Sequence, residues 1–124
     1  MILVDTSVWV DHLRAGEAQL VGLLNAGRVV MHPFVVGELA LGHLRQRQKV
    51  MEALQGLPKA KAATDAELLQ FIDQQQLAGL GIGYVDAHLL ASVRLVPGAR
   101  LWTRDQRLQH AASARGLAFE EPVH

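Results

Sequence analysis

Short apolar runs in this chain alternate with longer stretches in which apolar residues recur every three or four positions. The first run, residues 1–5 (MILVD), is apolar up to a closing acid, which predicts a strand buried on both faces, as in a parallel sheet. Further strands are predicted at 28–31, 100–103 and 117–120. Helical periodicity predicts helices over 6–13, 17–26, 33–45, 46–56, 64–76, 84–95 and 105–115.

Boundary residues support these elements. Gly27 is a natural helix stop, and Pro33 suits a first helical position. Thr64 and Glu67 have the spacing of a capping box, and the glycine-punctuated stretch 77–83 predicts a loop. Strands that alternate with helices predict an α/β fold, with a small, mostly parallel sheet flanked by helices on both faces. We expect one domain over residues 1–124.

The amino-acid composition limits the classes of protein to which the chain can belong. Half of the 124 residues are hydrophobic and 19% are charged, which is typical of a globular domain. The absence of cysteine excludes disulfides, thiol catalysis and thiolate metal sites. No apolar run approaches the roughly 18 residues of a membrane helix, and no secretory signal is expected, so we expect a cytoplasmic location. Twelve basic and twelve acidic side chains cancel, which argues against nucleic-acid binding by bulk positive charge.

Three acids occupy positions where parallel α/β sheets place ligands or where helices begin. Asp5 ends the first predicted strand, Asp105 follows the strand 100–103, and Asp86 lies near the start of its helix. Helix capping is the simpler interpretation of each acid taken alone. Thr6 or Ser7 could cap the first helix instead, which would leave the Asp5 carboxylate free.

Glu38 is harder to explain as a surface acid. Its helical neighbours Phe34, Val35, Leu41 and Gly42 offer neither a cation nor a donor. If buried, this carboxylate would need a positive partner from elsewhere; otherwise it reaches solvent at the edge of the apolar stripe. Together the four acids, without cysteine or histidine beside them, indicate an oxygen-ligand site for Mg²⁺, with Mn²⁺ as a substitute, of the kind used in phosphoryl chemistry.

Four segments in this order resemble the PIN-domain family, closely its VapC branch of bacterial toxins: MILVDTSVWVDHLR, VVGELALG, GIGYVDAHLLASV and LWTRDQRL. The resemblance covers essentially the whole chain. It implies a Rossmann-like three-layer sandwich and a metal-dependent ribonuclease that leaves a 5′-phosphate and a 3′-hydroxyl. The acidic quartet of the family falls on Asp5, Glu38, Asp86 and Asp105, and its hydroxyl positions are matched by Thr6, Ser7 and Thr103. The resemblance also implies a homodimer and a VapB-like antitoxin, for which the helices 46–56 and 64–76 are candidate surfaces.

Basic side chains could hold RNA around an acidic centre, and Arg45, Arg47 and Arg104 are the best placed along the chain. Trp9 and Trp102 could stack on bases, but tryptophans in such positions more often belong to the core. His88, two residues after Asp86, is expected to be structural.

Three alternatives compete with the nuclease. A receiver-like phosphorylation domain needs an acidic pair after the first strand, whereas Asp5 stands with Thr6 and Ser7. An aspartate-nucleophile phosphatase needs Asp-x-Asp there, and position 7 is serine. The remaining alternative is a catalytically inactive PIN-like module that binds RNA or protein.

Overall fold

The computed structural model describes residues 1–121. Three short strands, all parallel, form a sheet in the order β2-β1-β3. The strands are β1 (Ile2–Val4), β2 (Val29–Val30) and β3 (Arg100–Trp102). The helices are α1 (Thr6–Ala15), α2 (Ala18–Asn25), α3 (Pro33–Ala40), α4 (Arg47–Gln55), α5 (Asp65–Gln74), α6 (Tyr84–Arg94) and α7 (Gln106–Ala114). The predicted α/β class with a small parallel sheet is confirmed.

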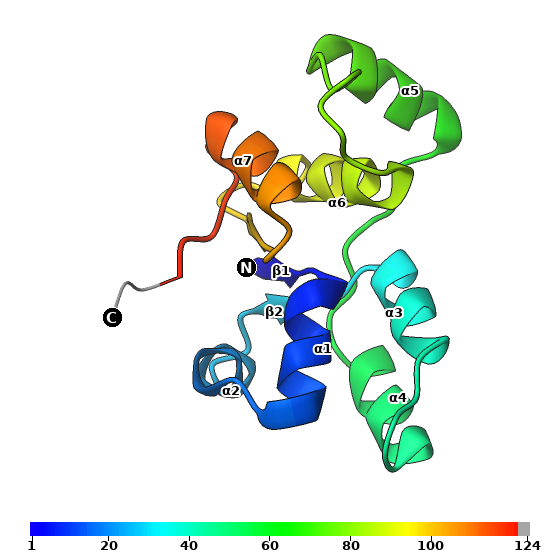
Figure 1. The fold of residues 1–124 in the computed structure, drawn as a ribbon, viewed down its shortest axis with the longest axis vertical. Coiled ribbons are helices and arrows are strands. Elements are labelled where there is room, and N and C mark those ends of the chain that lie inside the picture. Colours follow the sequence, from blue (N-terminus) through cyan, green and yellow to red (C-terminus); the bar gives the residue numbers. More distant parts are fainter. Residues whose placement is uncertain (122–124) are drawn as a thin grey trace.

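Helices cover both faces of the sheet. Figure 1 shows α6 and α7 on one side of the strands and α1 and α2 on the other, with α3 and α4 beside α1. β1 lies in the centre and is fully buried, which explains its uninterrupted apolar sequence. Helix α6 is buried continuously from Ala87 to Val93, so it forms much of the core on its side of the sheet.

Two predicted elements are wrong in extent. The helix predicted over 33–45 ends at Ala40, and the Arg47 guanidinium donates to the carbonyls of Ala40 and Gly42, at 2.5 and 3.3 Å, which the shortened helix leaves without helical partners. The strand predicted at 117–120 is only a single bridge between Ala118 and Leu101. Its two hydrogen bonds join Leu101 to the residues on either side of Ala118, and the pairing extends no further among the described residues.

The parallel sheet places the site. The carboxyl ends of all three strands lie along one edge, so Asp5 after β1 and Thr103 after β3 are neighbours across that edge. Helix α3 starts at the same edge after β2 and carries Glu38, and α6 enters it through the 77–83 loop. Within residues 1–121, no helix is long and apolar enough to cross a membrane.

Candidate active site

Asp5 is the best-anchored acid of the predicted quartet. Its side chain is buried, and its Oδ2 accepts hydrogen bonds of 2.8 Å from both Ser7 Oγ and Thr103 Oγ1. Ser7 Oγ in turn accepts from the backbone N–H of Arg104 at 3.0 Å. Both hydroxyls contact the same oxygen, and the described residues give Oδ1 no side-chain hydrogen bond. Asp5 is therefore oriented with one oxygen left for a ligand.

The first helix is not capped as the sequence predicted. Asp5 itself stands at the N-cap position in an extended conformation, but its side chain makes no cap hydrogen bond. Thr6 and Ser7 do not cap α1 either. Thr6 Oγ1 donates to Glu38 Oε1 at 2.8 Å, and Ser7 bonds Asp5. The hydroxyls orient two carboxylates of the quartet rather than the helix end.

Asp86 lies within range of the charges of the other three acids. Burial raises its pKa, a hydrogen bond of 3.4 Å from the Gly83 N–H opposes that rise, and the charges of Asp5, Asp105 and Glu38 add to it. Together with the hydrogen bonds that join Thr103 to Asp5 and Thr6 to Glu38, these charge effects indicate that the fold brings the four predicted acids to one region. Four segments that are far apart in the chain contribute one carboxylate each.

Asp105 and Glu38 are the exposed members of this group. Asp105 also caps α7, because its Oδ1 accepts from the Leu108 N–H at 3.0 Å, so the capping interpretation is correct for this acid. Its own N–H donates to Thr103 Oγ1 at 3.1 Å. The hydroxyl of Thr103 thus connects the backbone of one acid to the carboxylate of another.

The donor set suits a hard divalent cation. All four donors are carboxylates, which favour Mg²⁺ or Mn²⁺, and a cation near them would offset the mutual repulsion of their charges. In residues 1–121, no three acidic or histidine side chains lie close enough together to hold one metal ion between them. Mg²⁺ does not need three such ligands, since it usually keeps several waters and contacts one or two carboxylates directly. The residues present therefore fit the ion.

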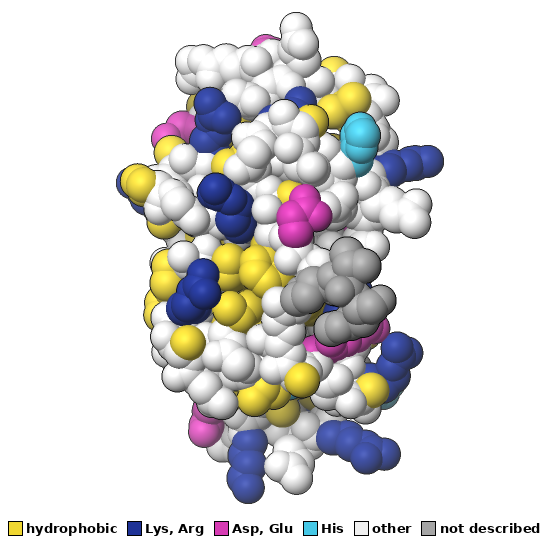
Figure 2. Space-filling model, turned by 90° about the vertical axis from the view of Figure 1, so that its left-hand side faces the viewer, with side chains coloured by type: hydrophobic (Ala, Val, Ile, Leu, Met, Phe, Trp, Pro, Cys, Tyr) yellow, Lys and Arg dark blue, Asp and Glu magenta, His cyan; other side chains and the backbone are white. Residues whose placement is uncertain are grey.

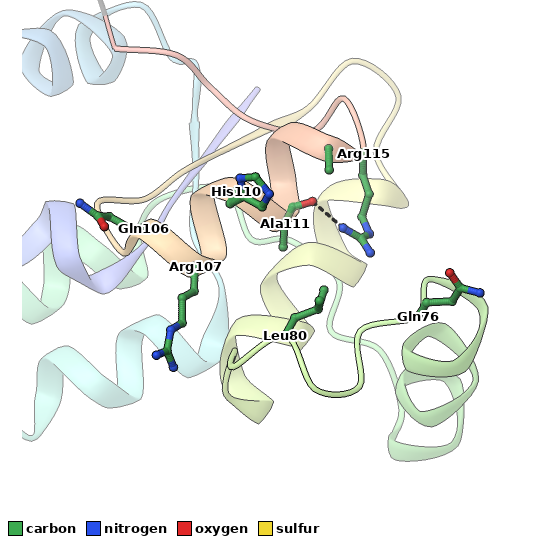
Figure 3. Close-up of a pocket in the computed structure, with 8 residues that line it drawn as sticks. Gln76, Leu80, Gln106, Arg107, His110, Ala111 and Arg115 are labelled. Atoms are coloured by element: carbon green, nitrogen blue, oxygen red, sulfur yellow. Dashed lines mark hydrogen bonds between the residues drawn. The ribbon is translucent and has the colours of Figure 1, made fainter.

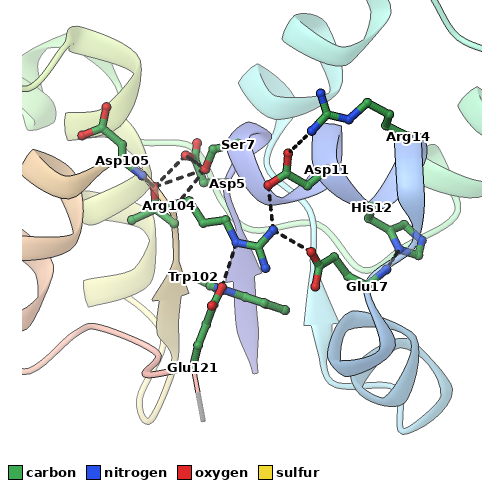
Figure 4. A network of polar contacts seen from close by, with 11 residues as sticks. Asp5, Ser7, Asp11, His12, Arg14, Glu17, Trp102, Arg104, Asp105 and Glu121 are labelled. Atoms are coloured by element: carbon green, nitrogen blue, oxygen red, sulfur yellow. Dashed lines mark hydrogen bonds and ion pairs between the residues drawn. The ribbon is translucent and has the colours of Figure 1, made fainter. Parts of the chain in front are cut away.

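The predicted RNA-contacting arginines have different surroundings. Arg45 lines a groove that also contains Glu38, whereas the Arg47 guanidinium contacts the end of α3. Arg104 is the centre of the polar network in Figure 4: it pairs with Asp11 and Glu17 at 2.7 Å and with Glu121 at 2.9 Å. The hydrogen bond to Glu17 raises the pKa of Arg104, burial opposes this, and the bonds to Asp11 and Glu121 add to the rise.

This network was not predictable from sequence spacing, because Asp11 and Glu17 lie 93 and 87 positions before Arg104. On the face shown in Figure 2, the Lys and Arg side chains of the described residues stand apart from one another rather than forming a continuous basic patch. Bulk positive charge on that face is therefore no basis for RNA binding.

Both tryptophans and His88 are core residues. Trp9 and Trp102 are 3% and 1% exposed, so the core interpretation is correct and neither presents a face for base stacking. His88 is buried with its ring edge-on to Phe34 and Tyr84, as expected for a structural residue.

The sequence and the fold match known proteins. A family model described as PIN domain matches residues 2–114, and the chain therefore belongs to the PIN-domain family. In particular, it is 50% identical over 123 residues to Ribonuclease VapC32 of Mycobacterium tuberculosis, in strains CDC 1551 and H37Rv, with 99% of each chain covered. This similarity supports its assignment to the VapC type. The crystal structure of FitAcB from Neisseria gonorrhoeae shares the fold, with a TM-score of 0.61 and 22% identity over 91% of this chain and 94% of that chain.

Proposed function

We propose that the chain is a ribonuclease toxin of a toxin–antitoxin pair and that its activity depends on Mg²⁺ held by Asp5, Glu38, Asp86 and Asp105. The observation that carries the proposal is the restraint of the buried Asp5 carboxylate by Ser7 and Thr103 at the carboxyl ends of the parallel strands β1 and β3, with one oxygen left for a ligand. The 50% identity to Ribonuclease VapC32 supports the substrate class.

The four acids have different roles in the proposed site. When bound, the divalent ion activates the attacking water and neutralises charge on the scissile phosphate. Asp5 supplies the most rigid ligand, because Ser7 and Thr103 restrain its carboxylate. Thr6 restrains Glu38 in the same way, and the Asp105 carboxylate, exposed at the start of α7, is placed to orient water. Asp86 is partly buried, so ion binding would favour its charged form.

We also propose that an antitoxin binds the chain beside the acidic site. A groove of about 500 Å³ between α1, α3 and α4 is lined by apolar side chains such as Val10, Leu39 and Val50 and also by Glu38. A peptide segment in this groove would cover one acid of the site and thereby silence it. Of the two helices expected to receive the antitoxin, α4 forms part of this groove through Val50.

We also propose a homodimer. Leu69 on α5 and Tyr84 at the start of α6 are 59% and 49% exposed, and the Tyr84 hydroxyl donates to Asp65 on α5, which joins the two helices into one surface. Sedimentation of the purified chain measures this directly. A monomer at all accessible concentrations would exclude the dimer without affecting the nuclease.

The test of activity is RNA cleavage by purified chain with Mg²⁺, with excess chelator, and by Asp5→Asn. We expect cleavage only in the first case, with 5′-phosphate product ends. Persistent RNA binding with no cleavage under Mg²⁺ or Mn²⁺ would contradict the proposal and favour the inactive binding module. Growth arrest on expression of the chain, absent for Asp5→Asn and relieved by the antitoxin, tests the toxin role.

A further inference from the structure

A second pocket, outside the acidic centre, lies between α7 and the loop that joins α5 to α6 (Figure 3). Its volume is about 620 Å³. Its lining combines apolar and polar side chains with two arginines, and includes Gln76, Leu80, Gln106, Arg107, His110 and Arg115. A pocket of this size holds a small ligand of roughly nucleotide dimensions.

The two arginines of this pocket differ in the hydrogen bonds that their side chains make. Arg115 is part of the framework, because its guanidinium donates to the carbonyls of Ala111 and Gln75 and so joins α7 to the end of α5. The Arg107 side chain makes no hydrogen bond or ion pair with the residues that the structure describes. In Figure 3 its side chain extends from α7 toward the start of α6, away from Arg115.

Gly81 creates the space for Arg107. A Cβ at position 81 would lie 2.7 Å from the Arg107 Nη1, and Gly81 has φ +78°, which side-chain-bearing residues rarely adopt. The glycine therefore allows the guanidinium to rest against the loop backbone. The Arg107 side chain thus lies against the loop at the rim of the pocket, with donors that the described residues do not use.

Both walls of the pocket continue into the acidic centre. Gln106 and Arg107 directly follow Asp105, and Gly81 is two residues before Gly83, whose N–H bonds Asp86. A ligand in the pocket would therefore lie next to the reacting phosphate. Since a cluster of four carboxylates repels a polyanion, an unpaired cation beside it is what an RNA strand requires.

We propose that this pocket holds one nucleotide of the single-stranded RNA substrate beside the scissile bond, with Arg107 binding its phosphate. Gln106 and His110 line the pocket, where an amide and an imidazole would offer hydrogen bonding and stacking to a base. The proposal rests on the proposed nuclease function and adds the subsite that positions the strand.

Each variant is made both in the Asp5→Asn chain and in the wild-type chain. Binding of a short fluorescein-labelled single-stranded RNA of random sequence is measured in the Asp5→Asn chain. Cleavage of the same RNA with Mg²⁺ is measured in the wild-type chain. Arg107→Ala is compared with Arg28→Ala. Arg28 is an exposed arginine that immediately precedes β2, at the opposite edge of the sheet. Neither side chain makes a hydrogen bond to a described residue, so both variants should fold, as circular dichroism will check.

We expect Arg107→Ala to weaken RNA binding by about tenfold, to raise KM more than it lowers kcat, and to reduce the salt dependence of binding by about one phosphate contact. Arg107→Lys should recover part of the affinity, and Arg28→Ala should match the parent. Gln106→Ala should change the preference among homopolymeric RNAs and leave the salt dependence unchanged.

The outcomes separate this proposal from the proposed function. If the wild type cleaves RNA and Arg107→Ala behaves like Arg28→Ala, the pocket proposal is overturned while the nuclease stands. If the wild type binds RNA through Arg107 but does not cleave it, the nucleotide-binding role of the pocket stands, while the nuclease and the position beside a scissile bond are overturned. If the wild type neither binds nor cleaves RNA, both are overturned.

Discussion

Thr103 Oγ1 donates a 2.8 Å hydrogen bond to Asp5 Oδ2 across 98 positions of the chain. The bond is buried and joins the carboxyl ends of β1 and β3. It is reinforced by Ser7, which bonds the same oxygen. A strand end, a hydroxyl from its own helix and a hydroxyl from the neighbouring strand therefore restrain one carboxylate, as a ligand-orienting arrangement requires.

Removing the Thr103 hydroxyl should impair catalysis. Thr103→Val keeps the shape of the side chain but loses the bonds to Asp5 and to the Asp105 N–H, so we expect RNA cleavage to slow by about 10- to 100-fold. The measurement is the cleavage rate as a function of Mg²⁺ concentration. Thr103→Ser should retain most activity, and a Thr103→Val chain as active as the wild type would contradict the orienting role.

The Thr6–Glu38 bond should matter less. Glu38 is exposed and its carboxylate can be rehydrated when Thr6→Val removes the 2.8 Å donor, so we expect a loss of a few-fold. Thr6→Ser should behave like the wild type in the same assay. A loss larger than that of Thr103→Val would show that Glu38, not Asp5, is the more important ligand.

Arg104 should stabilise the fold through its ion pairs. Its side chain is 28% exposed and bonds three carboxylates from different segments, so Arg104→Ala should lower the free energy of unfolding by about 2 kcal/mol. Arg14→Ala is the control, because Arg14 is 76% exposed and, among residues 1–121, forms an ion pair with Asp11 alone. Urea denaturation measures both, and equal effects would contradict the account of the network.

Buried His32 should make stability depend on pH. Burial, with a smaller contribution from the charge of His88, lowers the pKa of His32 from 6.5 to about 4. The unfolded chain binds this proton below about pH 6.5 and the folded chain does not, so stability is present above pH 6.5 and is lost as the pH falls toward 4, by up to about 3 kcal/mol.

His32→Asn tests this dependence. Asparagine can still accept from the Phe34 N–H, as His32 Nδ1 does at 3.0 Å, and so preserves the cap of α3. In urea unfolding between pH 7 and pH 4, the free energy of unfolding of the variant should decrease less steeply with falling pH than that of the wild type. Identical slopes would exclude His32 as the titrating group.

The residues that could be predicted are those whose signal is local. The apolar run before Asp5 predicts a central parallel strand, and the Thr64–Glu67 capping box at the start of α5 is confirmed. The positions of Asp5, Asp86 and Asp105 at strand ends and a helix start also follow from sequence, because parallel strands bring their carboxyl ends to one edge.

Other features depend on contacts between distant segments. At the early end of α3, the free carbonyl of Ala40 accepts from the guanidinium of Arg47, which lies beyond the helix. Arg104, adjacent to Asp105, could be assigned to RNA from its position alone, whereas its three acidic partners become neighbours only in the folded chain. The roles of Thr6 and Ser7 likewise follow from the tertiary positions of Glu38 and Thr103.

The most direct test of the central claim is Mn²⁺ binding measured by electron paramagnetic resonance for the wild type, Asp5→Asn, Asp86→Asn and the control Asp73→Asn. Asp73 is an exposed acid on α5 that takes no part in the quartet. We expect the wild type and Asp73→Asn to bind Mn²⁺ alike and Asp5→Asn and Asp86→Asn to bind it much more weakly. Mn²⁺ affinity unchanged in Asp5→Asn and Asp86→Asn would contradict the central claim.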